Sequence, residues 1–185
     1  MALFPSLPEN PHLADVFKTY PETLKPLLEY HDILLRGESP LSVAERELIA
    51  AFVSGLNACG FCYGAHKNYA VAFGIDEATI EALVADIDTA PIDEKLKPLM
   101  RYVAKLKDLP PRLVDSDAAA VYEAGWSERA LYDAIQVAAL FNLMNRIIEG
   151  TGVTFSYEDN PISDEELEVR RTRSYSDFGK EIGLD

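Results

Sequence analysis

The chain has 185 residues, of which 48% are hydrophobic and 26% are charged, a composition that suits one domain with a sizeable core. Its formal net charge of −14 repels phosphate-bearing surfaces, so we expect neither nucleic acid nor a membrane as a partner. The first 13 residues lack the basic cluster and apolar run of a secretory signal, and no apolar stretch approaches the roughly 20 residues of a membrane span, so we expect a cytoplasmic protein.

Helix start and stop signals follow one another along the chain, and no segment shows the period-two alternation of a strand. Ser42 and Glu45 form a capping-box pattern, Gly74 is a typical left-handed helix stop, and Ser127 precedes a long apolar-periodic segment. The sequence therefore predicts an all-α protein. We expect its helices at about 11–19, 21–36, 42–54, 58–73, 76 onward, 93–107, 116–125, 127–149 and 163–171.

The domain organisation follows from the same signals. We expect residues 1–160 to form a single helical domain that includes an N-terminal helical extension. Residues 161–185 are then a C-terminal tail and a candidate for wrapping a neighbouring subunit, and we expect the tail from Arg173 onward to be extended or loosely ordered.

Both cysteines and one of the three histidines fall within eight positions, at Cys59, Cys62 and His66. Spacings of three and four residues place side chains on one face of a helix. Cys59 lies near the predicted start of that helix, where free N–H groups and the helix dipole favour a thiolate. His66 lies one turn beyond Cys62, within reach of that sulfur. A base beside a thiol, with a second thiol to form a disulfide, indicates redox chemistry.

Two other interpretations of these residues stay open at this point. Two cysteines on a helix can be small core residues, and Cys59, Cys62, His66 and Glu47 offer a mixed ligand set to zinc. A structural zinc site usually draws on two separated ligand pairs, and the chain has no second pair of cysteines or histidines. We interpret His12 and His31 as structural residues, at the surface or partly buried.

The motif resembles the signature of the AhpD-like alkylhydroperoxidases, which belong to the carboxymuconolactone decarboxylase superfamily. In that signature a glutamate, here Glu47, precedes Cys59 by twelve positions, and Cys62 and His66 follow. The resemblance extends over residues 41–152 and is greatest to the peroxidase-related branch. The flanking segments that carry it are Leu41–Ser42, Glu45–Ile49, Phe141–Asn142, Asn145–Arg146 and Gly150. Gly60 and Phe61 depart from the founding members, which have a polar pair with an extra histidine between the cysteines.

The resemblance implies an AhpD-like helical bundle that forms homo-oligomers and reduces a hydroperoxide or a partner's disulfide. It implies that Cys62 attacks the peroxide, that Cys59 closes the disulfide, and that Glu47 and His66 form a proton relay. A dithiol or disulfide reductase is then the electron donor. We expect no organic cofactor, because no flavin, haem or nicotinamide motif is visible. The alternatives are a decarboxylase-type lyase of the same superfamily and a helical oligomer that senses redox state without turnover.

Overall fold

The computed structural model describes residues 3–108 and 112–184 and contains helices and no strand within those ranges. The predicted all-α class is confirmed. The elements are α1 (Leu13–Thr19), the 3₁₀ turn η1 (Pro21–Thr23), α2 (Leu24–Arg36), α3 (Val43–Leu56), α4 (Gly60–Ala72), α5 (Glu77–Ala85), α6 (Leu96–Leu106), α7 (Asp115–Glu123), α8 (Glu128–Thr151), α9 (Asp164–Thr172) and α10 (Tyr175–Glu181).

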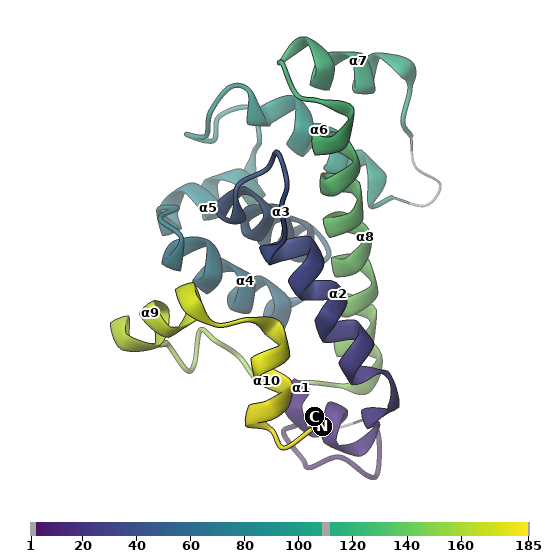
Figure 1. Ribbon diagram of the computed structural model, residues 1–185, viewed down its shortest axis with the longest axis vertical. Coiled ribbons are helices and arrows are strands. Elements are labelled where there is room, and N and C mark those ends of the chain that lie inside the picture. The colour runs from purple at the N-terminus through teal and green to yellow at the C-terminus, as the bar shows by residue number, and fades with distance from the viewer. Residues whose placement is uncertain (1–2, 109–111, 185) are drawn as a thin grey trace.

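Helix α3 lies at the centre of the bundle. It packs against α4 and α8, and every residue from Arg46 to Ser54 is buried. The long helix α8 runs along one side of the molecule, with α2 beside it, and α6 and α7 cap one end (Figure 1). This central position explains why α3 is apolar on nearly all its faces, since a helix buried all round has no solvated face to keep polar. Among the described helices, none combines the length and apolar character that a bilayer crossing requires.

Several predicted helix boundaries are confirmed by their caps. The Ser42–Glu45 capping box begins α3, the Asp76 side chain caps α5, and the Ser127 side chain caps α8. Gly74 has the predicted left-handed backbone, with φ of 96°. The long helix ends two residues later than expected, because Gly152 and not Gly150 adopts the left-handed conformation.

The predicted start of the helix after α3 was wrong. Asn57 is the C-cap of α3, and Cys59 is the N-cap of α4. Asn57 lies two residues before the N-cap, and its amide nitrogen donates instead to the side-chain oxygens of Asn142 and Asn145 on α8. Ala58 has φ of 54° and so cannot begin a right-handed helix.

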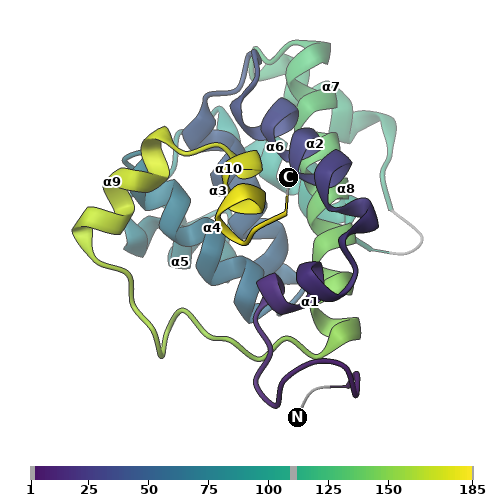
Figure 2. The same cartoon turned by 60° about the horizontal axis from the view of Figure 1, so that its bottom comes forward.

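The C-terminal tail, residues 161–184, folds back onto the same chain. Helix α9 packs against α4, and α10 packs against α2 (Figure 2). The expectation of an extended segment after Arg173 was wrong, because Ser174 and Asp177 form a capping box that begins α10. Wrapping of a neighbouring subunit by this tail stays a prediction.

Candidate active site

The two thiols lie where the chain leaves α3 and enters α4. Ala58 is the one described residue other than glycine with a positive φ, a conformation that costs an alanine about 1–2 kcal/mol. This turn directs the Cys59 backbone N–H to the Ser54 carbonyl at 3.0 Å. Cys59 then occupies the N-cap of α4 and Cys62 its third position, so both sulfurs lie in the first turn of the helix.

A buried amide of α8 fixes this turn from the other side. Asn145 is 2% exposed; its Nδ2 donates to the Ser54 hydroxyl at 3.1 Å, and its Oδ1 accepts from Asn57 at 2.8 Å. The Asn145 amide also reaches the Cys62 thiol. The strained connection is therefore held by hydrogen bonds on both sides, and these bonds keep the two cysteines in place.

The two thiols are free, buried and hydrogen-bonded to each other. The hydrogen bond from Cys62 is the main cause that lowers the pKa of Cys59, ahead of the opposing effect of burial. The hydrogen bond to Cys59, followed by burial, raises the pKa of Cys62 well above its usual range. In the resting dithiol, Cys59 is therefore the thiol that ionises first, with the Cys62 proton shared toward it.

Glu47 lies one layer deeper, on α3, and is fully buried. Its Oε2 accepts from His66 Nδ1 at 2.7 Å. Burial by itself would raise the pKa of Glu47, but the charge and hydrogen bond of His66, together with Arg36, bring the pKa below its usual value. Glu47 is thus ionised, and its bond to Nδ1 fixes the histidine ring with Nε2 turned away from the carboxylate.

Arg36 at the end of α2 supplies the second counter-charge to Glu47. Its Nη1 lies 2.6 Å from Glu47 Oε1. The guanidinium carbon also lies 4.9–5.2 Å from the centroids of three aromatic rings, those of Tyr69, Phe73 and Tyr175. A buried carboxylate needs such partners, since removing one partner of a buried ion pair typically costs about 3–5 kcal/mol.

Tyr175 of the tail completes this cluster. Its hydroxyl donates to Glu47 Oε1 at 2.7 Å and lies 3.5 Å from His66 Nδ1. The ring stacks on that of His66 with a centroid distance of 6.2 Å. Burial is the main cause that raises the pKa of Tyr175 well above its usual value, so the phenol stays protonated and acts as a donor. A residue near the C-terminus therefore hydrogen-bonds the carboxylate that orients His66.

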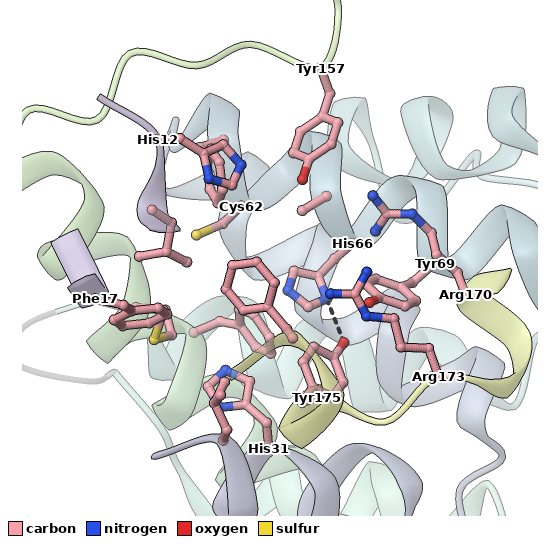
Figure 3. A pocket seen from close by; sticks show the side chains of 17 residues that line it. His12, Phe17, His31, Cys62, His66, Tyr69, Tyr157, Arg170, Arg173 and Tyr175 are labelled. Carbon is pink, nitrogen blue, oxygen red and sulfur yellow. Dashed lines mark hydrogen bonds between the residues drawn. The ribbon is translucent and has the colours of Figure 1, made fainter. Parts of the chain in front are cut away.

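Cys62 and His66 both line a partly open cavity of about 130 Å³. The rest of its wall is mainly aromatic and aliphatic, and the tail closes one side with Arg170, Arg173 and Tyr175 (Figure 3). Tyr157 packs over Gly64 at another side, where an added Cβ would come within 2.8 Å of the tyrosine. Cys59 does not line this cavity and lies instead at a separate hollow beside α5, with Gly55 and Val84.

The structure brings all four predicted site residues into one region, but with different access. Cys62 and His66 reach the cavity, Cys59 contacts Cys62, and Glu47 contacts His66. The zinc interpretation is not supported, because no three His, Cys, Asp or Glu side chains in residues 3–108 and 112–184 are arranged to hold a metal ion. His12 and His31, interpreted from the sequence as structural, both line the cavity as well.

Sequence reasoning missed three residues of this site, Arg36, Asn145 and Tyr175. Arg36 precedes Gly37 and has the position of an ordinary basic residue at a helix end. Asn145 was noticed only as part of the flanking resemblance. The serine and aspartate of the α10 capping box were the available signal for Tyr175, since they predict an ordered helix where we expected a loose tail.

Known proteins share the fold of this chain. Residues 21–103 match the carboxymuconolactone decarboxylase family. A solved, uncharacterised peroxidase-related protein from Silicibacter sp. TM1040 is 28% identical, with a TM-score of 0.70 over 76% of this chain and 73% of that one. A second, from Ralstonia eutropha JMP134 and described as an alkylhydroperoxidase AhpD core, is 20% identical with a TM-score of 0.70 over 84% and 77%, which shows the fold alone. No curated protein matches the chain. The predicted AhpD-like resemblance is confirmed.

Proposed function

From the match of residues 21–103 to the carboxymuconolactone decarboxylase family and from the site geometry, we propose that the protein is a thiol-dependent oxidoreductase that reduces an organic hydroperoxide. The observation that carries this proposal is the shared cavity of Cys62 and His66, with Cys59 hydrogen-bonded to Cys62. A mainly apolar cavity that holds a thiol and an oriented imidazole suits a small peroxide. The same pair of thiols could instead reduce a disulfide of a partner protein, which is the second substrate that we consider.

The first step is attack of the Cys62 thiolate on the distal peroxide oxygen. The O–O bond breaks, Cys62 becomes a sulfenic acid, and the alkoxide leaves and takes up one proton to give the alcohol. Glu47 holds His66 by Nδ1, so we assign to Nε2 the role of accepting the Cys62 proton and returning it to the leaving oxygen. Tyr175 and Arg36 keep Glu47 ionised and in place through these exchanges.

The second step forms the disulfide. The Cys59 thiol condenses with the Cys62 sulfenic acid, and water leaves. Residues at i and i+3 in a helix have Cβ atoms about 5–6 Å apart, so a modest adjustment of the first turn brings them to disulfide distance. An external dithiol then attacks the disulfide, becomes oxidised itself, and restores both thiols.

Two properties favour different cysteines as the thiol that attacks in the first step. The lowered pKa makes Cys59 the more readily ionised thiol, whereas access to the cavity favours Cys62 as the attacking atom. We assign attack to Cys62 because a peroxide must reach the sulfur before proton transfer matters, and one proton transfer within the pair or to His66 produces the Cys62 thiolate.

Anaerobic titration of thiols tests the reaction. The reduced protein should show two free thiols, and none after one equivalent of hydroperoxide. In Cys59→Ser the sulfenic acid should accumulate on residue 62, where a dimedone adduct locates it by mass spectrometry. In Cys62→Ser no adduct should form. Two thiols that persist under excess peroxide would contradict the proposal, and an adduct on Cys59 in Cys62→Ser would reverse the assigned order.

The same experiment separates the two alternatives. A lyase of this superfamily would leave both thiols unchanged through turnover, and a redox sensor would form the disulfide without continued peroxide consumption when a dithiol is supplied. Steady-state consumption of hydroperoxide with a dithiol therefore supports the peroxidase alone.

Assembly into a homo-oligomer is part of this proposal. Tyr30 and Ile33 on α2 and Tyr132 on α8 are exposed large hydrophobic residues, with Ile33 66% exposed, and subunit contacts are a common reason for such exposure. Light scattering should give a multiple of the 20.5 kDa chain mass. A monomer mass at micromolar concentration would contradict this part.

A further inference from the structure

The cavity has a charge character opposite to that of the whole protein. The chain carries a net charge of −14, yet no aspartate or glutamate is among the residues that line the cavity. Two arginines, Arg170 and Arg173, are among them. Glu47 lies behind His66 and is already paired with Arg36 and His66. A positive end in an otherwise apolar cavity is a feature to be explained, because guanidinium groups beside an apolar wall match a ligand that is both apolar and anionic.

Of the two arginines, Arg170 gives the stronger evidence for an anion-binding site. It comes from the last turn of α9 and is half-buried. Its guanidinium carbon lies 4.6 Å from the ring centroid of Tyr69 and 5.6 Å from that of Tyr157, so two aromatic faces hold it in position. It makes no hydrogen bond or ion pair with any described residue in 3–108 or 112–184. Its N–H donors are thus oriented but unused.

Arg173 is only partly satisfied. Its Nη2 pairs with Glu181 at 2.8 Å, and its guanidinium carbon lies 5.5 Å from the centroid of Phe178. Its Nε is buried and has no hydrogen-bond partner. Figure 3 shows Arg170 and Arg173 reaching from the tail toward the His66 and Tyr69 side of the cavity, across from Cys62. The guanidinium donors that have no protein partner therefore lie at the end of the cavity opposite the Cys62 thiol.

The remainder of the cavity wall is uncharged. Burial is the main cause that lowers the pKa of His12, and burial likewise lowers the pKa of His31 to about 4, so both rings are neutral near pH 7. Phenylalanine, tyrosine, leucine and methionine side chains supply most of the other contacts. The volume, about 130 Å³, is close to the roughly 150 Å³ of an apolar cavity that holds benzene.

We infer that the hydroperoxide reduced here has an apolar body of about one aromatic ring and carries a carboxylate, which Arg170 binds with support from Arg173. This inference rests on the proposed function and names the class of its substrate. The carboxylate would accept the unused guanidinium donors, which favour planar anions, while the ring fills the aromatic wall. The peroxide at the other end of the molecule is then directed to Cys62 and His66.

Binding of a redox-inert carboxylate tests this inference without any turnover. Calorimetric titration of the reduced, full-length protein with benzoate should give binding at least about 10-fold tighter than with benzamide, its neutral counterpart of the same shape. Arg170→Gln should weaken benzoate binding by about 10–100-fold, the usual range for a hydrogen bond to a charged group. Arg170→Lys keeps the charge but not the paired donors, so its affinity for benzoate should lie between that of the wild type and that of Arg170→Gln.

Two controls separate lost recognition from a damaged cavity. Benzamide binding should be unchanged in Arg170→Gln, because the ring contacts remain. Arg146→Gln removes the same charge from an exposed position on α8 outside the cavity, and should bind benzoate as the wild type does. Equal affinity for benzoate and benzamide, an unchanged benzoate affinity in Arg170→Gln, or binding of neither compound would overturn the inference.

The outcome is independent of whether the protein is a peroxidase. If neither compound binds but tert-butyl hydroperoxide still consumes both thiols, the proposed function stands and the substrate class is wrong. If benzoate binds through Arg170 and the thiols persist under excess hydroperoxide, the anion site stands and the proposed reaction is wrong.

Discussion

The α3–α4 pair and the C-terminal tail contribute to the same site by different physical means. In α3 every residue from Arg46 to Ser54 is buried, and α4 buries Cys62 and His66 among its apolar neighbours. Helix α9 has no buried residue at all, and α10 buries only Tyr175 and Gly179. The reacting atoms thus belong to the best-packed part of the chain, and the groups that close the cavity belong to the least-packed part.

This difference indicates that α3 and α4 hold the reacting groups rigidly, whereas the tail controls access to them. Local opening requires least free energy where few apolar contacts are lost, so the tail should open more readily than α3 or α4. Polar contacts help to hold the tail: Asp32 accepts from the start of α10, Arg171 donates to the Ala72 carbonyl, and Tyr175 donates to Glu47. Its apolar contacts with the core come from a few side chains such as Phe178. A substrate or a reducing dithiol could then reach Cys62 by displacement of the tail, with the thiol pair undisturbed.

The largest expected effect concerns the rigid part. His66→Ala should lower the rate of Cys62 oxidation by about 10²–10⁴-fold, the usual contribution of a positioned acid–base group. Glu47→Gln should lower it substantially, because the carboxylate that orients the imidazole is replaced by a neutral amide. The double variant should be little slower than His66→Ala alone, since groups that act as a unit are non-additive. Stopped-flow oxidation rates measure all three.

Glu45→Gln is the matched control for this series. Glu45 lies on the same helix and accepts from the Ser42 backbone N–H in the capping box, outside the cavity. Its substitution should affect stability slightly and the oxidation rate hardly at all. Fully additive effects of the His66 and Glu47 substitutions, or a wild-type rate in Glu47→Gln, would show that the two residues are not a relay.

The second prediction uses His31, which lies between the two regions. Its ring is 4% exposed and lies 5.2 Å from that of Tyr175 and 6.1 Å from that of Phe141. Burial lowers the pKa of His31 from 6.5 to about 4. Between these values the unfolded chain binds a proton that the folded chain does not. The stability that His31 contributes is therefore present above pH 6.5 and falls by about 3 kcal/mol as the pH drops to 4.

Urea unfolding from pH 7 to 4 measures this effect as a difference between the wild type and His31→Gln. His66, Glu47 and Asp32 act on His31 electrostatically, and they are present in both proteins, so the difference isolates the His31 proton. The wild-type free energy of unfolding should fall more steeply with decreasing pH. Parallel curves would show that His31 is not held neutral by the packing of the tail and core around it.

The sequence predicted the rigid part far better than the tail. Caps such as Ser42–Glu45 depend on neighbouring residues, and the spacing of Cys59, Cys62 and His66 depends only on helix geometry, so both could be predicted from the sequence. Arg36 and Tyr175 join Glu47 across 11 and 128 positions, and no local pattern encodes such distances. The start of α4 was misplaced for the same reason, since Asn57 is engaged by side chains of α8 that lie 85 and 88 positions away.

The smallest expected effect concerns how the tail is docked. The two carboxylate oxygens of Asp32 on α2 accept the backbone N–H groups of Tyr175 and Ser176, and one of them also accepts the Ser176 hydroxyl. These N–H groups belong to the first turn of α10, where a carboxylate satisfies unpaired donors and suits the helix dipole. Asp32→Ala should therefore destabilise the docked tail by about 1–2 kcal/mol.

Hydrogen exchange of the backbone amides distinguishes local from global destabilisation. In Asp32→Ala the amides of 175–182 should exchange about 10-fold faster, whereas the buried amides of α3 should change much less, because the tail opens without unfolding the core. Glu123→Ala removes a carboxylate from an exposed position on α7, a helix that packs against α6 and not against the tail, and should leave both regions unchanged. If α3 and the tail instead exchanged faster by the same factor, the two regions would open as one unit. The tail would then be part of the rigid core, and access to Cys62 would have to come through the cavity wall formed by other residues.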